Sequence, residues 1–185
     1  HYVKKDDAKA HEALLAIRDV TIEVSRASLQ AGASGVFFAS QLATSDLLTE
    51  SEYLDFGTNY DLEVLEETNG AGSQFTLVHI HGSNTFFHTL AGYPCNALNW
   101  HDRRVGPDIP SVQRAYPDLA TVAGIDEQGI AEMTPDEVRA QVREARVATG
   151  DRRLMIAPGC VILVATPQEN LNAAVAAAKT PRPQL

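Results

Sequence analysis

The sequence is poor in cysteine, in basic residues and in long apolar runs. Two cysteines, Cys95 and Cys160, cannot build the disulfide framework of a small secreted protein, which favours a reducing cytoplasm. A formal net charge of -9 without a basic stripe argues against a nucleic-acid partner. No apolar run approaches the roughly 18 residues that span a bilayer. No signal-peptide pattern opens the sequence, so we expect a cytoplasmic protein without a membrane partner.

The 185 residues suffice for one domain with a substantial core, and 44% of them are hydrophobic. Short apolar segments predict five strands, at residues 35–40, 75–81, 97–100, 120–125 and 154–157. Helical spacing and three T-x-x-E capping boxes predict helices at 8–31, 49–67, 84–90, 112–116, 134–148 and from 166 onward. One helix followed by five β-α pairs predicts a parallel sheet covered by helices. No GxGxxG or GxxxxGK[ST] motif follows a strand, which argues against a nucleotide-binding fold.

Polar side chains collect where the predicted strands end. They are Ser40, His79, His81, His101, Asp102, Asp126 and Cys160. A (β/α)8 barrel keeps its active site at the carboxyl ends of its strands. Five strands are too few to close such a barrel. The chain is therefore expected to be part of a barrel, or to cover its edge strands 35–40 and 154–157 with a second copy in a homo-oligomer.

His79 and His81 are the most informative of these residues. Residues i and i+2 of a strand point to the same face, so the two imidazoles converge. Converging imidazoles can ligate a metal ion, with Cys160 as a possible third ligand. The alternative is a pair of structural histidines satisfied by hydrogen bonds.

Several segments, in order, carry a resemblance to a known family. LVHIHG, NALNWHD, TVAGID and LMIAPGCVI…TPQENLNAAV resemble the carboxyl-terminal part of the uroporphyrinogen decarboxylase superfamily. The upstream GVFFAS and TESEYLDF are similar to the same family's preceding strand and helix. The resemblance implies that residues 1–179 are the last five β/α units of a (β/α)8 TIM barrel of the α/β class, followed by a tail at 180–185.

The family has two branches, and the resemblance implies different sites for each. One branch transfers a methyl group from a methylated corrinoid to a thiol, using zinc held by His-x-Cys and a distant Gly-Cys. The matching positions here are His79, His81 in place of the cysteine, and Cys160. The other branch decarboxylates uroporphyrinogen III in haem biosynthesis without a cofactor. There, a histidine that contacts substrate replaces Cys160, and Ser40 matches a serine that contacts substrate.

These observations lead to a ranked functional prediction. We expect a zinc-dependent, methyltransferase-like enzyme that acts on a small molecule or on a tetrapyrrole or corrinoid substrate. The alternatives are a cofactor-free uroporphyrinogen decarboxylase and a non-catalytic binding or assembly module. His101 is a candidate general acid or base, and Asp126 a candidate catalytic residue. Their structural alternatives are a hydrogen-bonded strand end and a helix cap, respectively.

Overall fold

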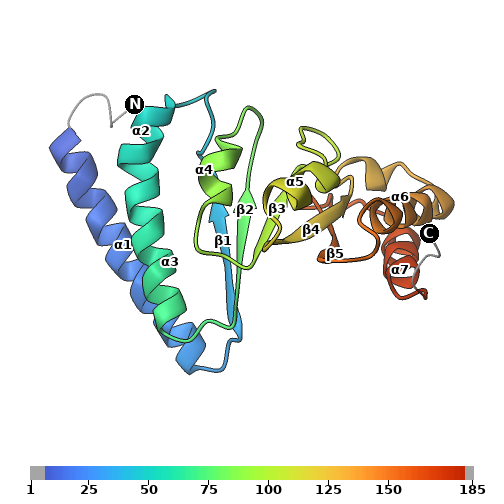
Figure 1. The fold of residues 1–185 in the computed structure, drawn as a ribbon, viewed down its shortest axis with the longest axis horizontal. Coiled ribbons are helices and arrows are strands. Elements are labelled where there is room, and N and C mark those ends of the chain that lie inside the picture. Colours follow the sequence, from blue (N-terminus) through green and yellow to red (C-terminus); the bar gives the residue numbers. More distant parts are fainter. Residues whose placement is uncertain (1–6, 182–185) are drawn as a thin grey trace. The chain divides into compact units, whose positions relative to one another are not determined.

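The computed structural model describes residues 7–181, and its elements follow the predicted order of one helix and five β-α pairs (Figure 1). In chain order they are α1 (Asp7–Gln30), β1 (Gly35–Ser40), α2 (Glu50–Tyr53), a π-helical turn (Leu54–Thr58), α3 (Asn59–Gly70), β2 (Phe75–Ile80), α4 (Phe87–Ala91), β3 (Ala97–Trp100), α5 (Ile109–Ala115), β4 (Ala120–Ile125), a 3-10 turn (Gly129–Ala131), α6 (Pro135–Ala148), β5 (Leu154–Pro158) and α7 (Gln168–Ala178). Residues 182–185 of the expected tail lie outside the described residues.

The strands form one sheet in the order β1-β2-β3-β4-β5. Parallel pairing aligns Ala97 of β3 with Ala120 of β4, and Thr121 of β4 with Leu154 of β5. The fold is therefore the predicted α/β class, an open parallel sheet that corresponds to part of a TIM barrel. β1 and β5 are the edges, as expected, and the homo-oligomer that would cover them stays a prediction. No helix within residues 7–181 combines the length and hydropathy needed to cross a membrane.

The chain divides into two compact units. Unit 1 runs up to Val78 and includes Gly82–Asn96, whereas unit 2 consists of His79–His81 and the chain from Ala97 onward. The core of unit 2 lies between β4, α6 and α7, where the buried side chains are Ile125, Ile130, Val138, Val142, Ala173 and Ala174.

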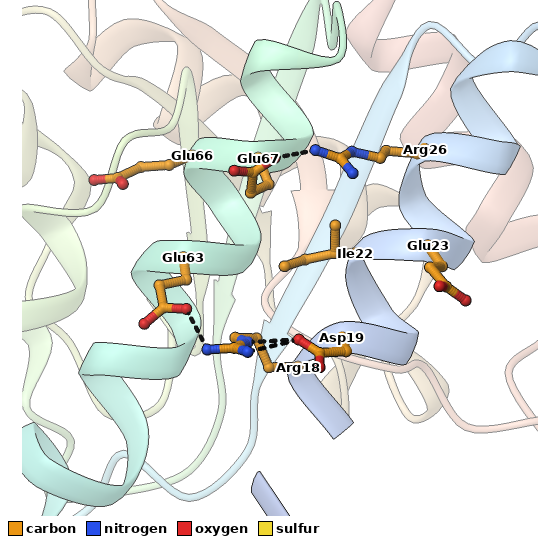
Figure 2. Close-up of a pocket in the computed structure, with 8 residues that line it drawn as sticks. All are labelled: Arg18, Asp19, Ile22, Glu23, Arg26, Glu63, Glu66 and Glu67. Atoms are coloured by element: carbon orange, nitrogen blue, oxygen red, sulfur yellow. Dashed lines mark hydrogen bonds and ion pairs between the residues drawn. The ribbon is translucent and has the colours of Figure 1, made fainter. Parts of the chain in front are cut away.

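In unit 1, α1 lies along α3 through a row of charged residues (Figure 2). Arg18 of α1 donates to Glu63 of α3 at 2.6 Å. Arg26, further along α1, pairs with Glu67, which lies one turn after Glu63 on α3. Ile22 lies between the two arginines on the same groove. Exposed ion pairs of this kind each stabilise a fold by less than about 1 kcal/mol, so they orient α1 more than they anchor it.

The helix expected at 49–67 begins and ends close to its predicted limits but contains the π-helical turn at Leu54–Thr58. Gly57 in this turn faces the ring of Tyr53, and a Cβ at Gly57 would lie 2.5 Å from that ring. A glycine is therefore needed where the helix wraps around a buried tyrosine.

Two of the three predicted capping boxes are confirmed, and the third is wrong. The Thr49 and Thr134 hydroxyls accept from the amides of Glu52 and Glu137, whose carboxylates accept in return from the threonine amides. Near residue 166, the chain makes a turn from Leu163 instead, and α7 begins at Gln168 with Pro167 as its N-cap. The Thr166 hydroxyl is left buried without a hydrogen-bond partner in the described part of the chain.

This contrast predicts opposite results for two similar substitutions in T-P-x-E sequences. Thr134→Ala removes a real cap and should lower the free energy of unfolding by about 1 kcal/mol. Thr166→Ala should leave it unchanged or raise it, because the lost hydroxyl is buried without a partner. Urea unfolding followed by the fluorescence of Trp100, the single tryptophan, measures both. Equal losses in the two variants would contradict this account of α7.

Candidate metal centre

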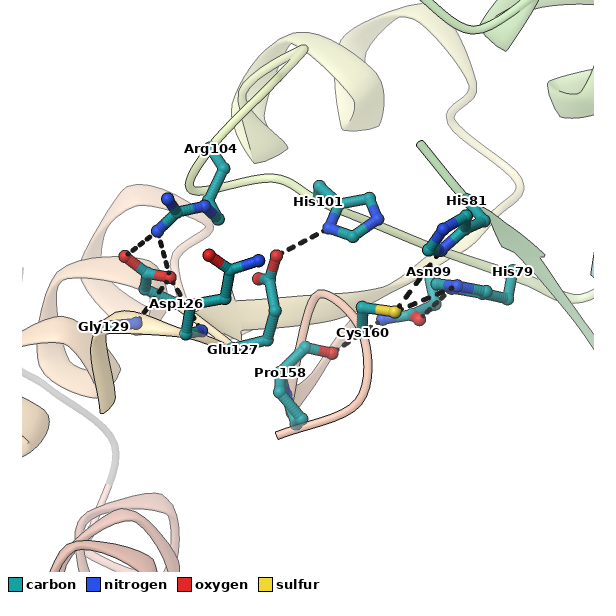
Figure 3. A network of polar contacts seen from close by, with 11 residues as sticks. His79, His81, Asn99, His101, Arg104, Asp126, Glu127, Gly129, Pro158 and Cys160 are labelled. Carbon is teal, nitrogen blue, oxygen red and sulfur yellow. Dashed lines mark hydrogen bonds and ion pairs between the residues drawn. The ribbon is translucent and has the colours of Figure 1, made fainter. Parts of the chain in front are cut away.

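Four side chains from three strand ends converge in unit 2 (Figure 3). His79 and His81 belong to the end of β2, His101 follows β3, and Cys160 follows β5. One ligand atom from each lies within 4.8 Å of all the others. The structure therefore brings together the three residues expected to bind metal and adds His101 as a fourth. This set, here called the His/Cys cluster, is a candidate metal-binding site.

The β2 sequence delivers both histidines to one face. His79 is a buried residue near the end of β2, and His81 directly follows the strand, two residues further along the chain. Gly82 then adopts a φ of 97°, a conformation that side chains disfavour, and the strand does not continue. The two imidazole centroids are 5.9 Å apart, which leaves them facing a common space.

The Cys160 sulfur lies almost equally far from both rings of β2. Its Sγ is 3.6 Å from His79 Nε2 and 3.5 Å from His81 Nδ1. In a tetrahedral zinc site, with Zn–S near 2.3 Å and Zn–N near 2.0–2.1 Å, the sulfur and nitrogen would be about 3.5–3.6 Å apart. The measured distances thus fit a shared metal ion, and they equally permit weak S–H···N hydrogen bonds.

Asn99 fixes which nitrogen of His79 faces the sulfur. The Asn99 amide nitrogen donates to the carbonyl oxygens of Val122 and Pro158 at 2.6 and 3.0 Å. Its Oδ1 must therefore face His79, and it accepts from Nδ1 at 2.6 Å. The Nε2 lone pair is left pointing toward Cys160. Burial, aided by the nearby His101 and His81, lowers the pKa of His79 and favours the neutral ring that a metal requires.

Glu127 performs the same task for His101. The His101 Nδ1 lies 2.6 Å from Oε1 of Glu127, a carboxylate that is only 1% exposed. With the Nδ1 proton directed at Glu127, the His101 Nε2 lone pair faces the cluster. This Nε2 is buried and has no hydrogen-bond partner among residues 7–181. A buried ring nitrogen without a partner is the position that an ion or a substrate proton would satisfy.

The strand-end residues predicted from the sequence included Asp102 but not Glu127. Asp102 accepts from the Gly124 amide at 3.2 Å and lies 3.6 Å from Arg103. Burial, partly offset by the Gly124 bond, raises the pKa of Asp102 to about 6. One feature of the sequence could have indicated Glu127: it is an acidic residue two positions beyond the end of β4, next to the predicted Asp126.

Asp126 caps a turn outside the cluster. Its Oδ1 accepts from the amides of Gln128 and Gly129 at 3.1 and 3.0 Å, and Arg104 pairs with it at 3.1 Å (Figure 3). Burial acts to raise the pKa of Asp126, but these bonds outweigh it and the pKa is lowered. A catalytic role for Asp126 stays a prediction that these contacts do not support.

Ser40 belongs to unit 1, and its hydroxyl is buried against the hydroxyl of Tyr53, 2.9 Å away. Its expected contact with substrate stays a prediction.

Gly159 lets the loop that carries Cys160 approach closely. A Cβ at Gly159 would lie 2.6 Å from the Trp100 carbonyl oxygen, 2.9 Å from the His101 Cα and 3.0 Å from Glu127 Oε2. Two of these three atoms are backbone, which cannot move aside easily. The Gly-Cys pair therefore has a steric reason: any larger residue at 159 would push the sulfur away from the imidazoles.

Comparisons with known proteins agree with this fold. The family profile described as Uroporphyrinogen decarboxylase (URO-D) matches residues 1–181. Among solved structures, a methyltransferase from Methanosarcina mazei superimposes with a TM-score of 0.70 at 22% sequence identity. The match covers 87% of this chain and 46% of the methyltransferase chain, so this chain spans about half of that protein. No curated protein sequence matches this chain.

The steric argument predicts that Gly159→Ala destabilises the protein. Overpacking against backbone atoms should cost about 1–3 kcal/mol of unfolding free energy. Gly70→Ala is a suitable control, because a Cβ at this last residue of α3 would meet no atom within 4 Å. Urea unfolding measures both variants. Similar stabilities for the two would show that the loop carrying Cys160 is not held as tightly as described.

Proposed function

This chain belongs to the uroporphyrinogen decarboxylase family, and from that premise we propose that it is a zinc-dependent, methyltransferase-like enzyme that activates a thiol. One observation carries the proposal. The Cys160 sulfur and two imidazole nitrogens, from segments about 80 residues apart in sequence, meet at 3.5 and 3.6 Å.

The donor set suits zinc. Thiolate and imidazole are common protein ligands of zinc. A soft sulfur ligand argues against magnesium or calcium, which prefer oxygen ligands. His79 Nε2, His81 Nδ1 and Cys160 Sγ would hold the ion. Three protein ligands with one position left over is the arrangement of a catalytic zinc site. When bound, zinc lowers the pKa of a coordinated thiol and so supplies a thiolate nucleophile at neutral pH.

His101 would receive the proton that the thiol loses. Its Nε2 faces the cluster and has no hydrogen-bond partner within residues 7–181, and Glu127 holds its Nδ1 proton. Once protonated at Nε2, the ring would carry a positive charge next to the buried Glu127 carboxylate, which stabilises it. The thiolate would then attack the methyl carbon and form an S–C bond, while the bond between that carbon and its donor breaks and leaves its electron pair on the donor. A methylated corrinoid is the donor class we propose.

The residue at position 160 favours methyl transfer over decarboxylation. A cysteine there can supply a metal ligand, where the resemblance gives the decarboxylase branch a histidine for substrate. A solved structure with a similar fold is described as a methyltransferase, and at 22% identity that likeness concerns the fold alone. The decarboxylase reading needs no metal, so a metal measurement separates the two.

Zinc analysis tests the proposal with the two cysteines as a matched pair. The protein should bind about one zinc per chain, because the donors form a single site. Cys160→Ala should lower zinc affinity at least about tenfold by removing the only thiolate of the cluster. Cys95→Ala, which changes the other cysteine outside the cluster, should not. Elemental analysis after dialysis and titration against a chelator measure both.

Two results would contradict the proposal. One is a wild-type protein that takes up no zinc. The other is Cys160→Ala that retains wild-type affinity. Turnover of a porphyrinogen by metal-free protein would favour the decarboxylase alternative.

A further inference from the structure

A second polar centre lies in unit 1 and consists of a half-buried carboxylate with two buried tyrosines. Asp61 Oδ2 accepts from the Tyr53 hydroxyl at 2.8 Å and from the Tyr93 hydroxyl at 3.0 Å. Tyr53 and Tyr93 are 3% and 4% exposed. The Ser40 hydroxyl lies 2.9 Å from the Tyr53 oxygen and can donate to it when Tyr53 donates to Asp61. The hydroxyl protons are thus arranged around an anionic Asp61.

The negative charge of Asp61 has no cationic partner. No lysine, arginine or histidine within residues 7–181 pairs with this carboxylate, and its Oδ1 accepts no hydrogen bond from them. Burial raises the pKa of Asp61, while the two phenol bonds act to lower it. A partly desolvated anion without a counter-ion costs free energy, and such groups cluster at binding and catalytic sites.

The same carboxylate lines a pocket of about 590 Å³. Its other polar side chains are Ser40, Gln41 and Tyr53. The remaining wall is largely apolar, with Leu14, Leu42 and Phe56 among its residues. All of these residues lie in unit 1. An apolar pocket with one anionic group and two aromatic rings is the environment that attracts an organic cation, through ion pairing and cation–π contact.

The charged groove between α1 and α3 differs in this respect. Its Glu63 and Glu67 already have arginine partners (Figure 2). The other two glutamates of that groove, Glu23 and Glu66, are exposed to solvent, whereas the Asp61 carboxylate is half-buried beside an apolar wall.

We propose that the pocket at Asp61 binds a small alkylammonium ion, with the ammonium group on the Asp61 carboxylate and the alkyl group against the apolar wall. The proposal does not rest on the zinc-dependent function, because every residue that it uses lies outside the His/Cys cluster.

A pair of isosteric probes tests it on the intact protein. The probes are 3-methylbutylammonium and its neutral counterpart 3-methylbutan-1-ol, which share the alkyl group and differ in charge. Isothermal titration calorimetry should show the ammonium binding at least about tenfold more tightly than the alcohol, because hydrogen bonds to a charged partner are the stronger ones. Equal affinities, or no binding of the ammonium, would overturn the proposal without any variant.

Asp61→Asn provides the second arm. It keeps an oxygen that can accept from the tyrosines but removes the charge, so ammonium affinity should fall about tenfold and alcohol affinity should not change. Asp118→Asn, at an exposed aspartate, removes the same charge elsewhere and should leave ammonium binding unchanged. Cys160→Ala should also bind the ammonium as the wild type does, which keeps this test separate from that of the zinc site. Wild-type ammonium affinity in Asp61→Asn would overturn the proposal.

Discussion

The orientation of the His79 and His101 rings depends on two short hydrogen bonds at their Nδ1 atoms. Asn99 accepts from one ring and Glu127 from the other, both at 2.6 Å. Each bond keeps the ring proton on Nδ1, the nitrogen that faces away from the cluster. It leaves an Nε2 lone pair directed toward the cluster. Without these acceptors, the rings could turn, and the Cys160 sulfur would face N–H groups in place of lone pairs.

The sheet brings the residues of the His/Cys cluster close together, which the hydrogen bonds alone cannot do. Parallel strands end at the same edge, so residues far apart in the chain gather there. The side chain of Cys160 reaches that edge because Gly159 has no Cβ to collide with the Trp100 carbonyl. The His101 Nε2 and Glu127 Oε2 remain at the centre of this arrangement as buried atoms without a partner in the described part of the chain. Their desolvation is a cost that a bound ligand would offset.

Much of this was predictable because it follows from short-range periodicity. Strand alternation places His79 and His81 on one face whatever the rest of the chain does. Glu127 was not predictable in the same way. Strand β4 ends at Ile125, and in the irregular chain beyond it no alternation rule says which of two adjacent carboxylates turns inward. The Asp61–Tyr93 contact spans 32 residues and joins α3 to the bend after α4, so no sequence periodicity predicts it.

The account turns on whether Cys160 and the imidazoles share one ion, and X-ray absorption at the zinc edge of the zinc-loaded protein tests this most directly. We expect one sulfur near about 2.3 Å and nitrogen neighbours near about 2.0–2.1 Å. A zinc environment made only of nitrogen and oxygen neighbours would contradict the account, since it would place the ion away from Cys160.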